Sequence, residues 1–360
     1  MNKQNCSPYS QIRIKEKRKK RILLSVFGFL LFVIGFFSLF AGPSSLSFSD
    51  SFFALFGKGE RVNIRIRQNI RLPRILAGII AGIGLSVSGL IRQSCLDNPM
   101  ASPSTLGISN AAVLGANVAI ILLSRGSVKT EHNTNWNSFN PYAVSRISFF
   151  FSFGAIFLIL TLAKLRKFTP ETIVLAGVCL SSLFSAITTL LQYFATDSQL
   201  SSSVYWSFGD LGRVGYKEIL ILFVLVTLSY LAFAFFASPL NALSLGEEEA
   251  RRTGINTEIL RFILLALSSL IIACCISFFG IIGFIGLICP HRAKKIFGGN
   301  HHYLLPSSAL TGALLLLLSD DIARVVLRGF SLPVGAVTAI LGAPFFLCLL
   351  LSYERSKHHA

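Results

Sequence analysis

The chain has 360 residues, of which 53% are hydrophobic and only 14% are charged, and its mean hydropathy is +0.67. A soluble domain of this length could not hide so much apolar surface, so we predict an integral membrane protein. The net charge is +17 and the seven cysteines form no Cys-x-x-Cys pair, which argues against a disulfide or metal framework.

The N-terminal segment 1–21 is strongly basic, with eight Lys and Arg against one acid, Glu16. A basic run of this kind can also bind nucleic acid or a charged surface. Because it directly precedes an apolar stretch, we interpret it as a cytoplasmic anchor under the positive-inside rule. A cleaved signal peptide is the other option, but the apolar run is long and Ala41-Gly42-Pro43 is a poor cleavage site, so we expect the segment to be retained.

Ten apolar stretches have the length of bilayer-spanning helices. They cover 22–40, 72–93, 105–124, 143–165, 170–194, 217–237, 257–279, 284–298, 304–324 and 333–352. The predicted fold is therefore an all-α membrane protein with ten transmembrane helices over 22–352. An even number of spans returns the short tail 353–360 to the cytoplasm, and the polar loops 125–142 and 195–216 then face outward.

Six basic residues oppose the positive-inside rule, because they fall in the predicted outer segment 58–74. They are Lys58, Arg61, Arg65, Arg67, Arg71 and Arg74. In Arg71-Leu72-Pro73-Arg74 the proline fixes the entry to the second span and sets two cations at the membrane rim. An isolated pair of this kind would by default be two snorkelling side chains.

Asp320, Asp321 and Arg324 end the ninth predicted span on the same face. They could cap helices, or Arg324 could join the first two arginines in a basic rim that orients a partner. Intramembrane carboxylates often relay protons, but these two are predicted at the end of a span. We expect essentially no other ionisable group inside the helices, which argues against ion-coupled transport.

Local capping patterns predict several helix boundaries. Thr169-Pro170-Glu171 combines an N-cap, an N1 proline and a first-turn acid, and Ser102-Pro103 suggests a similar start for the third span. Ser244-Leu245-Gly246-Glu247 matches a capping box, and Gly254 is placed to end a helix in a left-handed conformation. We therefore predict a short amphipathic helix over 245–253, outside the membrane, that another protein could hold.

The eighth span is short and rich in helix-breaking residues, namely Gly280, Gly283, Gly286 and Pro290. Unwound backbone at membrane depth is tolerated where it lines a cavity or packs in protein, which favours a substrate path. A tightly packed contact between helices through small residues explains the same pattern equally well. The sequence leaves both interpretations open.

Sites for catalysis and for metal or nucleotide binding are not expected in this chain. His301-His302 and His358-His359 are adjacent pairs rather than the i,i+4 pair of a helical metal site, and no phosphate-binding Gly-rich loop, nucleophile elbow or His-Glu-x-x-His motif occurs. We predict no cofactor, no bound metal and no enzymatic activity.

Six motifs resemble the permease subunit of type II ABC importers for iron–siderophore complexes, haem and cobalamin. They are RLPRILAGIIAGIGLSVSGLIRQ (71–93), DNPMASPSTLGIS (97–109), VLAGVCLSSLFSAITTL (174–190), LNALSLGEEEARRTGI (240–255), GIIGFIGLICPH (280–291) and LPVGAVTAILGAPFFLCLL (332–350). The likeness covers nearly the whole chain from about residue 60. It implies a permease of ten helices that pairs with a second copy or a paralogue, two ATPase subunits and an extracytoplasmic binding protein.

The resemblance also implies roles for particular residues. The coupling helix that sits in a cleft of the ATPase corresponds to Leu243, Ser244, Leu245, Gly246, Glu247, Glu248, Ala250, Arg251 and Gly254. Binding-protein docking carries over to Arg71, Arg74 and Arg324, and the cytoplasmic gate to Asn98, Met100 and Thr169. Met100 replaces a leucine of the family pattern, Thr169-Pro170-Glu171 stands where small hydroxyl residues are expected, and WSFGDL (206–211) also departs from it.

The function implied is ATP-driven import by alternating access. We expect the protein in the bacterial inner or plasma membrane, with both chain termini in the cytoplasm. We favour a ferric siderophore as cargo, on family frequency alone; haem and cobalamin permeases share these motifs. Two other classes remain as alternatives: a secondary transporter or channel that works alone, and a membrane receptor or structural subunit. Membrane lipid is the remaining expected partner, and no nucleic acid is expected.

Overall fold

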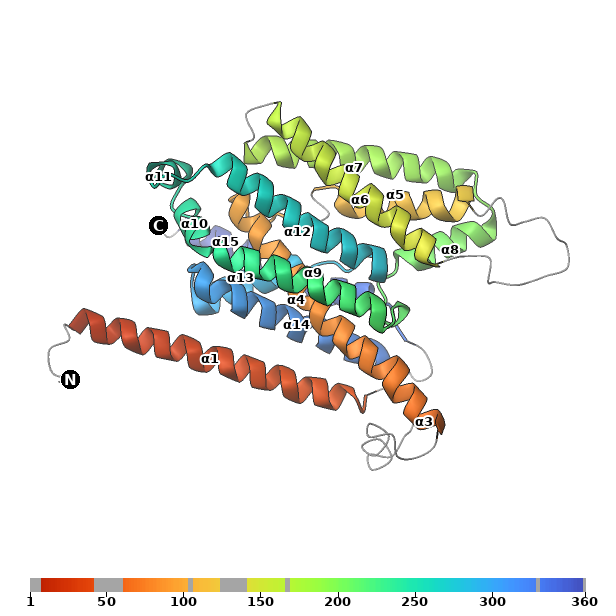
Figure 1. The fold of residues 1–360 in the computed structure, drawn as a ribbon, viewed down its shortest axis with the longest axis horizontal. Helices are drawn as coiled ribbons and strands as arrows, with labels where there is room; N and C mark the ends of the chain where they lie inside the picture. Colours follow the sequence, from red (N-terminus) through yellow and green to blue (C-terminus); the bar gives the residue numbers. More distant parts are fainter. Residues whose placement is uncertain are drawn as a thin grey trace, which may run out of the picture.

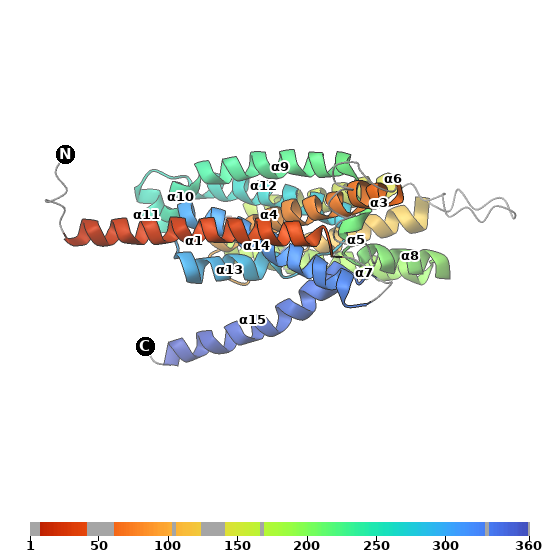
Figure 2. The ribbon, with the colours of Figure 1, turned by 90° about the horizontal axis from the view of Figure 1, so that it is seen from below.

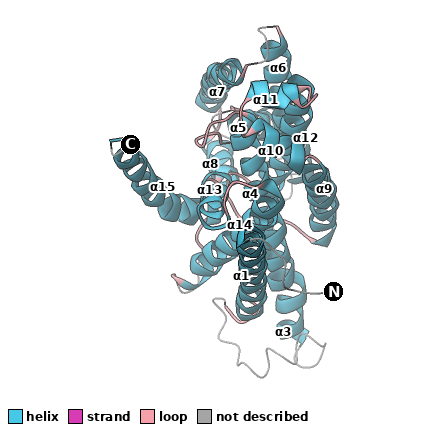
Figure 3. Ribbon diagram, turned by 90° about the vertical axis from the view of Figure 1, so that its left-hand side faces the viewer, coloured by secondary structure: helices cyan, strands magenta, loops and turns pink. Residues whose placement is uncertain are grey.

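The computed structural model describes residues 8–41, 61–102, 106–123, 141–165, 169–327 and 331–358. These residues form helices and the turns between them, with one isolated bridge between Phe208 and Ile281 (Figure 3). The predicted all-α class is confirmed for this part of the chain. Loop 125–142 falls almost entirely outside it.

The first half of the chain supplies several of the long helices of the bundle. They are α1 (Pro8–Ser38), α3 (Arg61–Ile66), the π-helical turn η1 (Arg67–Arg71), α4 (Leu72–Cys95), α5 (Ile108–Asn117), the π-helical turn η2 (Val118–Leu123), α6 (Pro141–Lys164) and α7 (Pro170–Tyr193). The basic segment before the first span is not a separate tail, because α1 runs unbroken from Pro8 through it.

The second half continues with shorter connecting helices between the long ones. They are α8 (Asp197–Ser207), the 3-10 turn η5 (Leu211–Arg213), α9 (Tyr216–Phe235), α10 (Ala237–Leu243), α11 (Glu247–Arg252), α12 (Thr257–Phe279), α13 (Ile285–Phe297), α14 (His301–Val325) and α15 (Val334–His358). The polar stretch 195–216 was predicted as a loop, yet most of it is helical.

Helix α4 is the centre of the bundle, and it packs against α9, α12, α13 and α14 (Figure 1). Glycines make two of these crossings close. A Cβ atom on Gly89 would collide with the backbone of Gly286 in α13, and one on Gly82 would lie 2.5 Å from the carbonyl oxygen of Gly312 in α14. Small residues allow helix backbones to approach in this way in membranes.

The two ends of the bundle differ in what they carry. Figure 1 places α11, the start of α1 and the end of α15 at one end, while α3 and α8 lie at the other. Helix α15 leans away from the bundle along its length (Figure 2). We call the end with α11 the inner end and the end with α3 the outer end.

Seven helices of the described part are long and apolar enough to cross a bilayer, and Ile108–Leu123 and Val334–Leu347 are shorter apolar helices. All ten predicted apolar stretches coincide with helices, but α13 has only 13 residues. The count of ten crossings therefore stays a prediction. The third span begins at Ile108 after Gly107, whose φ is +69°, so the start expected at Ser102-Pro103 is wrong.

Candidate functional site

The connection between α9 and α12 forms two short helices at the inner end, rather than one. Helix α11 spans Glu247–Arg252, with Gly246 as its N-cap at φ +123° and no side-chain cap. The predicted capping box is wrong, because the Ser244 hydroxyl donates instead to the carbonyl of Leu240, 2.9 Å away. Helix α10 uses Ser244 at its own C-terminus, which leaves α11 shorter than the predicted 245–253.

The predicted end of this helix is confirmed. Gly254 has a φ of +81°, and its N–H donates to the Arg251 carbonyl at 2.9 Å. The N–H of Ile255 reaches the Ala250 carbonyl at 3.2 Å. A left-handed residue after the last turn satisfies helix carbonyls in this manner.

Glu247 joins α11 to α12 and, through Arg261, to α4. Its carboxylate pairs with Arg251 at 2.7 Å and with Arg261 of α12 at 2.8 Å. Arg261 is buried and also donates to the carbonyl of Cys95, the last residue of α4, at 3.0 Å. Partial burial opposes ionisation of Glu247, but hydrogen bonds and charge attraction from the two arginines lower the pKa of this carboxyl. The ion pair therefore persists at neutral pH.

The rest of the connection presents side chains outward. Leu245 is 78% exposed, and Glu248 and Arg251 are also exposed, whereas Leu243 and Ala250 are buried. Two apolar residues thus fix the connection to the bundle, while a leucine and several charges are available to a partner.

Arg71 and Arg74 meet Arg324, which is distant from them in sequence, at the outer end. Arg74 pairs with Asp320 at 2.8 Å, and Arg324 pairs with the other oxygen of the same carboxylate at 3.0 Å. Arg71 donates to the Leu39 carbonyl at 2.9 Å. The three arginine side chains are buried and Asp320 is fully buried. They are not snorkelling side chains, so that alternative is wrong.

Further groups complete this outer network. Asp321 pairs with Arg324 and accepts a hydrogen bond from the Ser38 hydroxyl at 2.6 Å. Asp210 lies 3.3 Å from Arg74. The two carboxylates of α14 bind arginines of α4 and α14 rather than capping a helix. Sequence analysis did not find Asp210 or Ser38, because no local pattern marks a contact between segments so far apart.

The predicted gate residues lie in two separate turns. The side-chain oxygen of Asn98 accepts from the N–H of Met100 at 2.9 Å, and Met100 is 44% exposed. Thr169 is the N-cap of α7 and accepts from the N–H of Thr172 at 3.4 Å, as predicted. Among the described residues, no hydrogen bond connects these two turns.

The interrupted segment before α13 combines non-helical backbone with a close contact between helices, and the substrate path stays a prediction. Gly280 ends α12 with a φ of +81°, and the chain is non-helical until Ile285. Gly286, however, lies in the close contact with α4 described above. Pro290 lacks an N–H and so frees the carbonyl of Gly286. The side-chain amide of Gln93 donates to this carbonyl in place of the missing N–H. Its nitrogen lies 3.4 Å from the Gly286 oxygen and 3.2 Å from the carbonyl oxygen of Leu287.

The sequence WSFGDL (206–211), which departs from the family pattern, packs on the interrupted segment before α13. The N–H of Ile281 donates to the Ser207 carbonyl at 3.3 Å, and the N–H of Asp210 donates to the Phe279 carbonyl at 2.9 Å. The Arg213 guanidinium donates to the carbonyls of Trp206 and Phe208, each at 2.7 Å. Part of the non-helical backbone therefore has hydrogen-bond partners within the protein, which lowers the cost of placing it at membrane depth.

Arg92 corrects the expectation that the helix interiors hold almost no ionisable groups. It is fully buried in α4 and donates to the hydroxyls of Ser268 and Ser269 in α12, at 3.4 and 3.0 Å. His301 also has a structural place, between Ser94 at 2.8 Å and Asn241 at 2.9 Å. In the described segments, no three His, Cys, Asp or Glu side chains are grouped so as to hold a metal ion.

The FecCD transport family matches this chain over residues 30–352. The chain belongs to this family. It is a permease of the type II ABC importer class.

Individual relatives cover the chain almost end to end. A protein of Methanocaldococcus jannaschii that is named an ABC transporter permease is 44% identical over 340 residues, which are 94% of this chain and 97% of the relative. The hemin transport permease HmuU of Yersinia pestis is 33% identical, over 94% of this chain and 97% of its own. The vitamin B12 permease BtuC of Shigella boydii is 34% identical, over 95% and 98%.

A solved structure shows the same architecture. It is described as a metal-chelate type ABC transporter in an inward-facing conformation, and it superimposes with a TM-score of 0.77 at 30% identity. The match covers 92% of this chain and 99% of the other. Fold and transport class are therefore established, while the relatives differ in their named cargo.

Proposed function

We propose that this permease imports a ferric siderophore, and that ATPase subunits drive it through α10 and α11. The observation that carries the coupling proposal is the contact chain from Glu247 through Arg261 to the carbonyl of Cys95. A displacement of α11 would act directly on α12 and on α4, the central helix. Alternating access needs such a connection between the motor and the bundle.

The orientation and the outer partner belong to the same proposal. The inner end faces the cytoplasm with both chain termini, and a substrate-binding protein docks at the outer end over Arg71, Arg74 and Arg324. The docking assignment rests on the family resemblance; the three guanidinium groups share the outer network with the carboxylates of Asp210, Asp320 and Asp321, and acidic groups on a binding protein would have to exchange with these partners. A second copy or a paralogue completes the pore, with the turns at Asn98–Met100 and Thr169 at its inner mouth and the segment from Gly280 to Pro290 along the path.

A test of coupling compares Glu247→Gln with Glu249→Gln. Glu249 lies on the same helix and, in the part of the chain that the structure describes, is paired with Arg252 alone, at 2.9 Å. In proteoliposomes with the ATPase and binding protein, we expect Glu247→Gln to lower uptake by up to about fivefold while ATP hydrolysis continues, since a partly exposed ion pair is worth up to about 1 kcal/mol. Equal uptake by the two variants would show that this contact does not transmit the motion.

Docking is tested with Arg71→Glu/Arg74→Glu. We expect this variant to lose binding of the substrate-binding protein while it still copurifies with the ATPase, and that retained interaction reports that the inner end is folded. Normal binding would overturn the docking assignment. Uptake by the purified chain under an ion gradient, without ATPase, would favour a secondary transporter instead.

Cargo is tested by transport of radiolabelled ferric siderophore, haemin, cobalamin and molybdate by one preparation. The solved neighbour of metal-chelate type supports a chelate, whereas the named relatives support haem, vitamin B12 or molybdate. Saturable uptake of haemin or cobalamin in place of the siderophore would reassign the cargo without changing the coupling proposal.

A further inference from the structure

Three carboxylates of the described residues share the outer network, and they differ in how firmly the protein holds them. Asp320 is fully buried between two arginines at 2.8 and 3.0 Å, and the Asp321 side chain, which pairs with Arg324, is 19% exposed. The Asp210 side chain is 40% exposed, and it lies 3.3 Å from Arg74, farther than Asp320 does. An exposed ion pair contributes little, whereas breaking a buried pair leaves a charge without compensation. Asp210 is therefore the exchangeable partner of Arg74.

Arg74 divides its donors between the bundle and the segment that carries Asp210. Its Nε donates to Asp320 at 2.8 Å, while one terminal nitrogen lies 3.3 Å from the Asp210 carboxylate and 3.2 Å from the hydroxyl of Ser331. A guanidinium group offers several donors in a fixed fork, so one can keep its partner while another changes. Asp320 thus holds Arg74 in place during an exchange at its terminal nitrogen.

Asp210 belongs to a segment that packs on the interrupted backbone before α13. Besides the hydrogen bonds described above, Gly209 makes this contact close, because a Cβ atom on it would lie 2.5 Å from the carbonyl oxygen of Ile281. The same glycine meets the start of α15, since its carbonyl accepts from the N–H of Gly335 at 3.4 Å. A Cβ atom on Gly335 would lie 2.4 Å from the Ile281 oxygen. We call the residues 207–212, 279–281 and Gly335 the outer junction.

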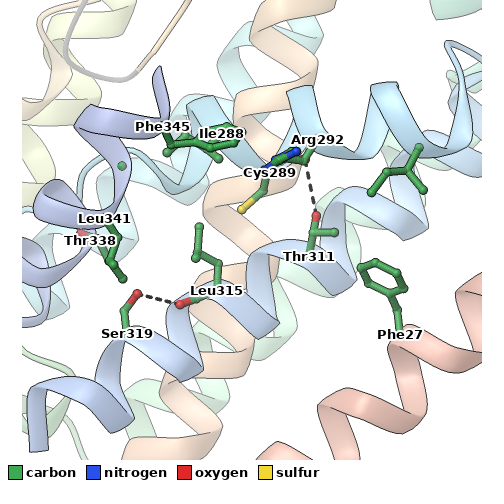
Figure 4. Close-up of a pocket in the computed structure, with 12 residues that line it drawn as sticks. Phe27, Ile288, Cys289, Arg292, Thr311, Leu315, Ser319, Thr338, Leu341 and Phe345 are labelled. Carbon is green, nitrogen blue, oxygen red and sulfur yellow. Dashed lines mark hydrogen bonds between the residues drawn. The ribbon is translucent and has the colours of Figure 1, made fainter. Parts of the chain in front are cut away.

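Beyond the outer junction, α15 packs only partly against its neighbours. Gly342 makes one further close contact, because a Cβ atom on it would lie 2.5 Å from the Cβ atom of Phe284. A cavity of about 440 Å³ separates part of α15 from α14, with Thr338 and Leu341 on one side and Leu315 on the other (Figure 4). A shift of the outer junction would therefore move α15 together with the segment that the proposed function places along the path.

We propose that Asp210 occupies, in the undocked permease, the place on Arg74 that a carboxylate of the binding protein takes on docking. The exchange frees the outer junction from Arg74, and docking is thereby transmitted to the interrupted segment and to α15. Asp320 stays bound throughout, which keeps the outer end folded. This role of Asp210 depends on the docking site proposed above at Arg71, Arg74 and Arg324, and it adds the group that the partner displaces.

The first experiment measures how tightly the permease, assembled with its ATPase in lipid nanodiscs, binds the fluorescently labelled substrate-binding protein. We expect Asp210→Asn to bind it between about twofold and fivefold more tightly, since the partner no longer competes with an exposed ion pair. Asp197→Asn is the matched control, because it removes the same charge from an exposed position at the outer end, in the first turn of α8. Its affinity should stay close to that of the wild type, since salt screens a distant exposed charge.

Comparison with the arginine variant separates this role from the docking site itself. If Arg71→Glu/Arg74→Glu abolishes binding but Asp210→Asn binds like the wild type or more weakly, docking at the arginines stands and the role of Asp210 is overturned. Equal tightening by Asp210→Asn and Asp197→Asn would overturn it as well, because a general change of charge would then suffice. Normal binding by the arginine variant would overturn the docking site and the role of Asp210 together.

A second experiment follows the outer junction through Trp206, which directly precedes it. The chain has two tryptophans, so Trp136→Phe leaves Trp206 as the only one, and the permease is measured alone in detergent. We expect Asp210→Asn to increase the quenching of Trp206 emission by acrylamide, because the freed segment exposes this ring, whereas Asp197→Asn should not. Size-exclusion profiles report whether each variant is folded. Unchanged quenching in Asp210→Asn would overturn the link between the ion pair and the outer junction.

Discussion

The two ends of this permease use arginine–carboxylate pairs in opposite ways. At the outer end, Asp320 is fully buried between Arg74 and Arg324. At the inner end, the Glu247 side chain is 37% exposed and the Arg251 side chain is 60% exposed. Burial makes the outer network costly to break, since a lost partner leaves a charge without compensation. The inner pairs are exposed to water and contribute less to stability.

Arg261 is an exception, because it is a buried arginine that forms an ion pair at the exposed inner end. Its side chain is only 6% exposed, yet it pairs with the partly exposed Glu247. The buried half of this contact anchors it to the bundle, and the exposed half follows α11. A rigid outer end and a mobile inner connection are therefore expected from the charge burial alone.

The largest predicted effect is at the outer end. Asp320→Asn removes the carboxylate that two buried arginines share, and we expect a loss of about 3–5 kcal/mol of folding free energy. Thermal unfolding of the purified protein measures the change. The control is Asp197→Asn, the same substitution at an exposed residue in the first turn of α8, which should cost less than about 1 kcal/mol. Similar shifts for both variants would mean that burial does not decide the strength of the outer network.

Capping patterns in the sequence predicted helix ends correctly where no neighbouring helix competes for the same side chain. Thr169 caps α7 as its neighbours indicate, and Gly254 ends α11. The capping box at Ser244 failed because α10 precedes it and takes the hydroxyl. Helix α8 was missed although Thr196 and Gln199 form a capping box, since the stretch lacks the apolar periodicity that marked the spans.

Contacts between distant segments could not be read from any local pattern. Arg74 and Asp320 are 246 residues apart, and each looked like a charge at a membrane rim. Their burial follows from the close crossing of α4 and α14 through Gly82 and Gly312. The sequence predicts that small residues pack, but not which helix meets which. The hydrogen bond from the Gln93 side chain to the Gly286 carbonyl is another contact between distant segments that no local pattern predicts.

The second prediction concerns Arg261, the buried arginine of the ion pairs at the inner end. Arg261→Gln takes a donor from the Cys95 carbonyl, one of the terminal carbonyls of α4 that have no partner within the helix, and it breaks the pair with Glu247. We expect a loss of about 1–3 kcal/mol by thermal unfolding. Arg252→Gln, at a side chain 70% exposed that pairs with Glu249, should cost less than about 0.5 kcal/mol. Equal costs would remove the distinction between anchored and exposed inner pairs.

The smallest effect is the pH dependence of the Glu247 pair. Its pKa is lowered from 4.5 in the folded protein, so the ionised carboxylate stabilises the folded state fully above about that pH. The contribution is lost as the pH falls through the lowered pKa. Because the group is partly exposed and screened, we expect less than about 1 kcal/mol between wild type and Glu247→Gln. The difference in unfolding midpoint should be constant from about pH 8 to 6 and shrink below about pH 4.5, with Glu248→Gln as the charge-matched control. A difference that grew on acidification would mean that the carboxylate destabilises the fold, and the inner connection would then need another anchor.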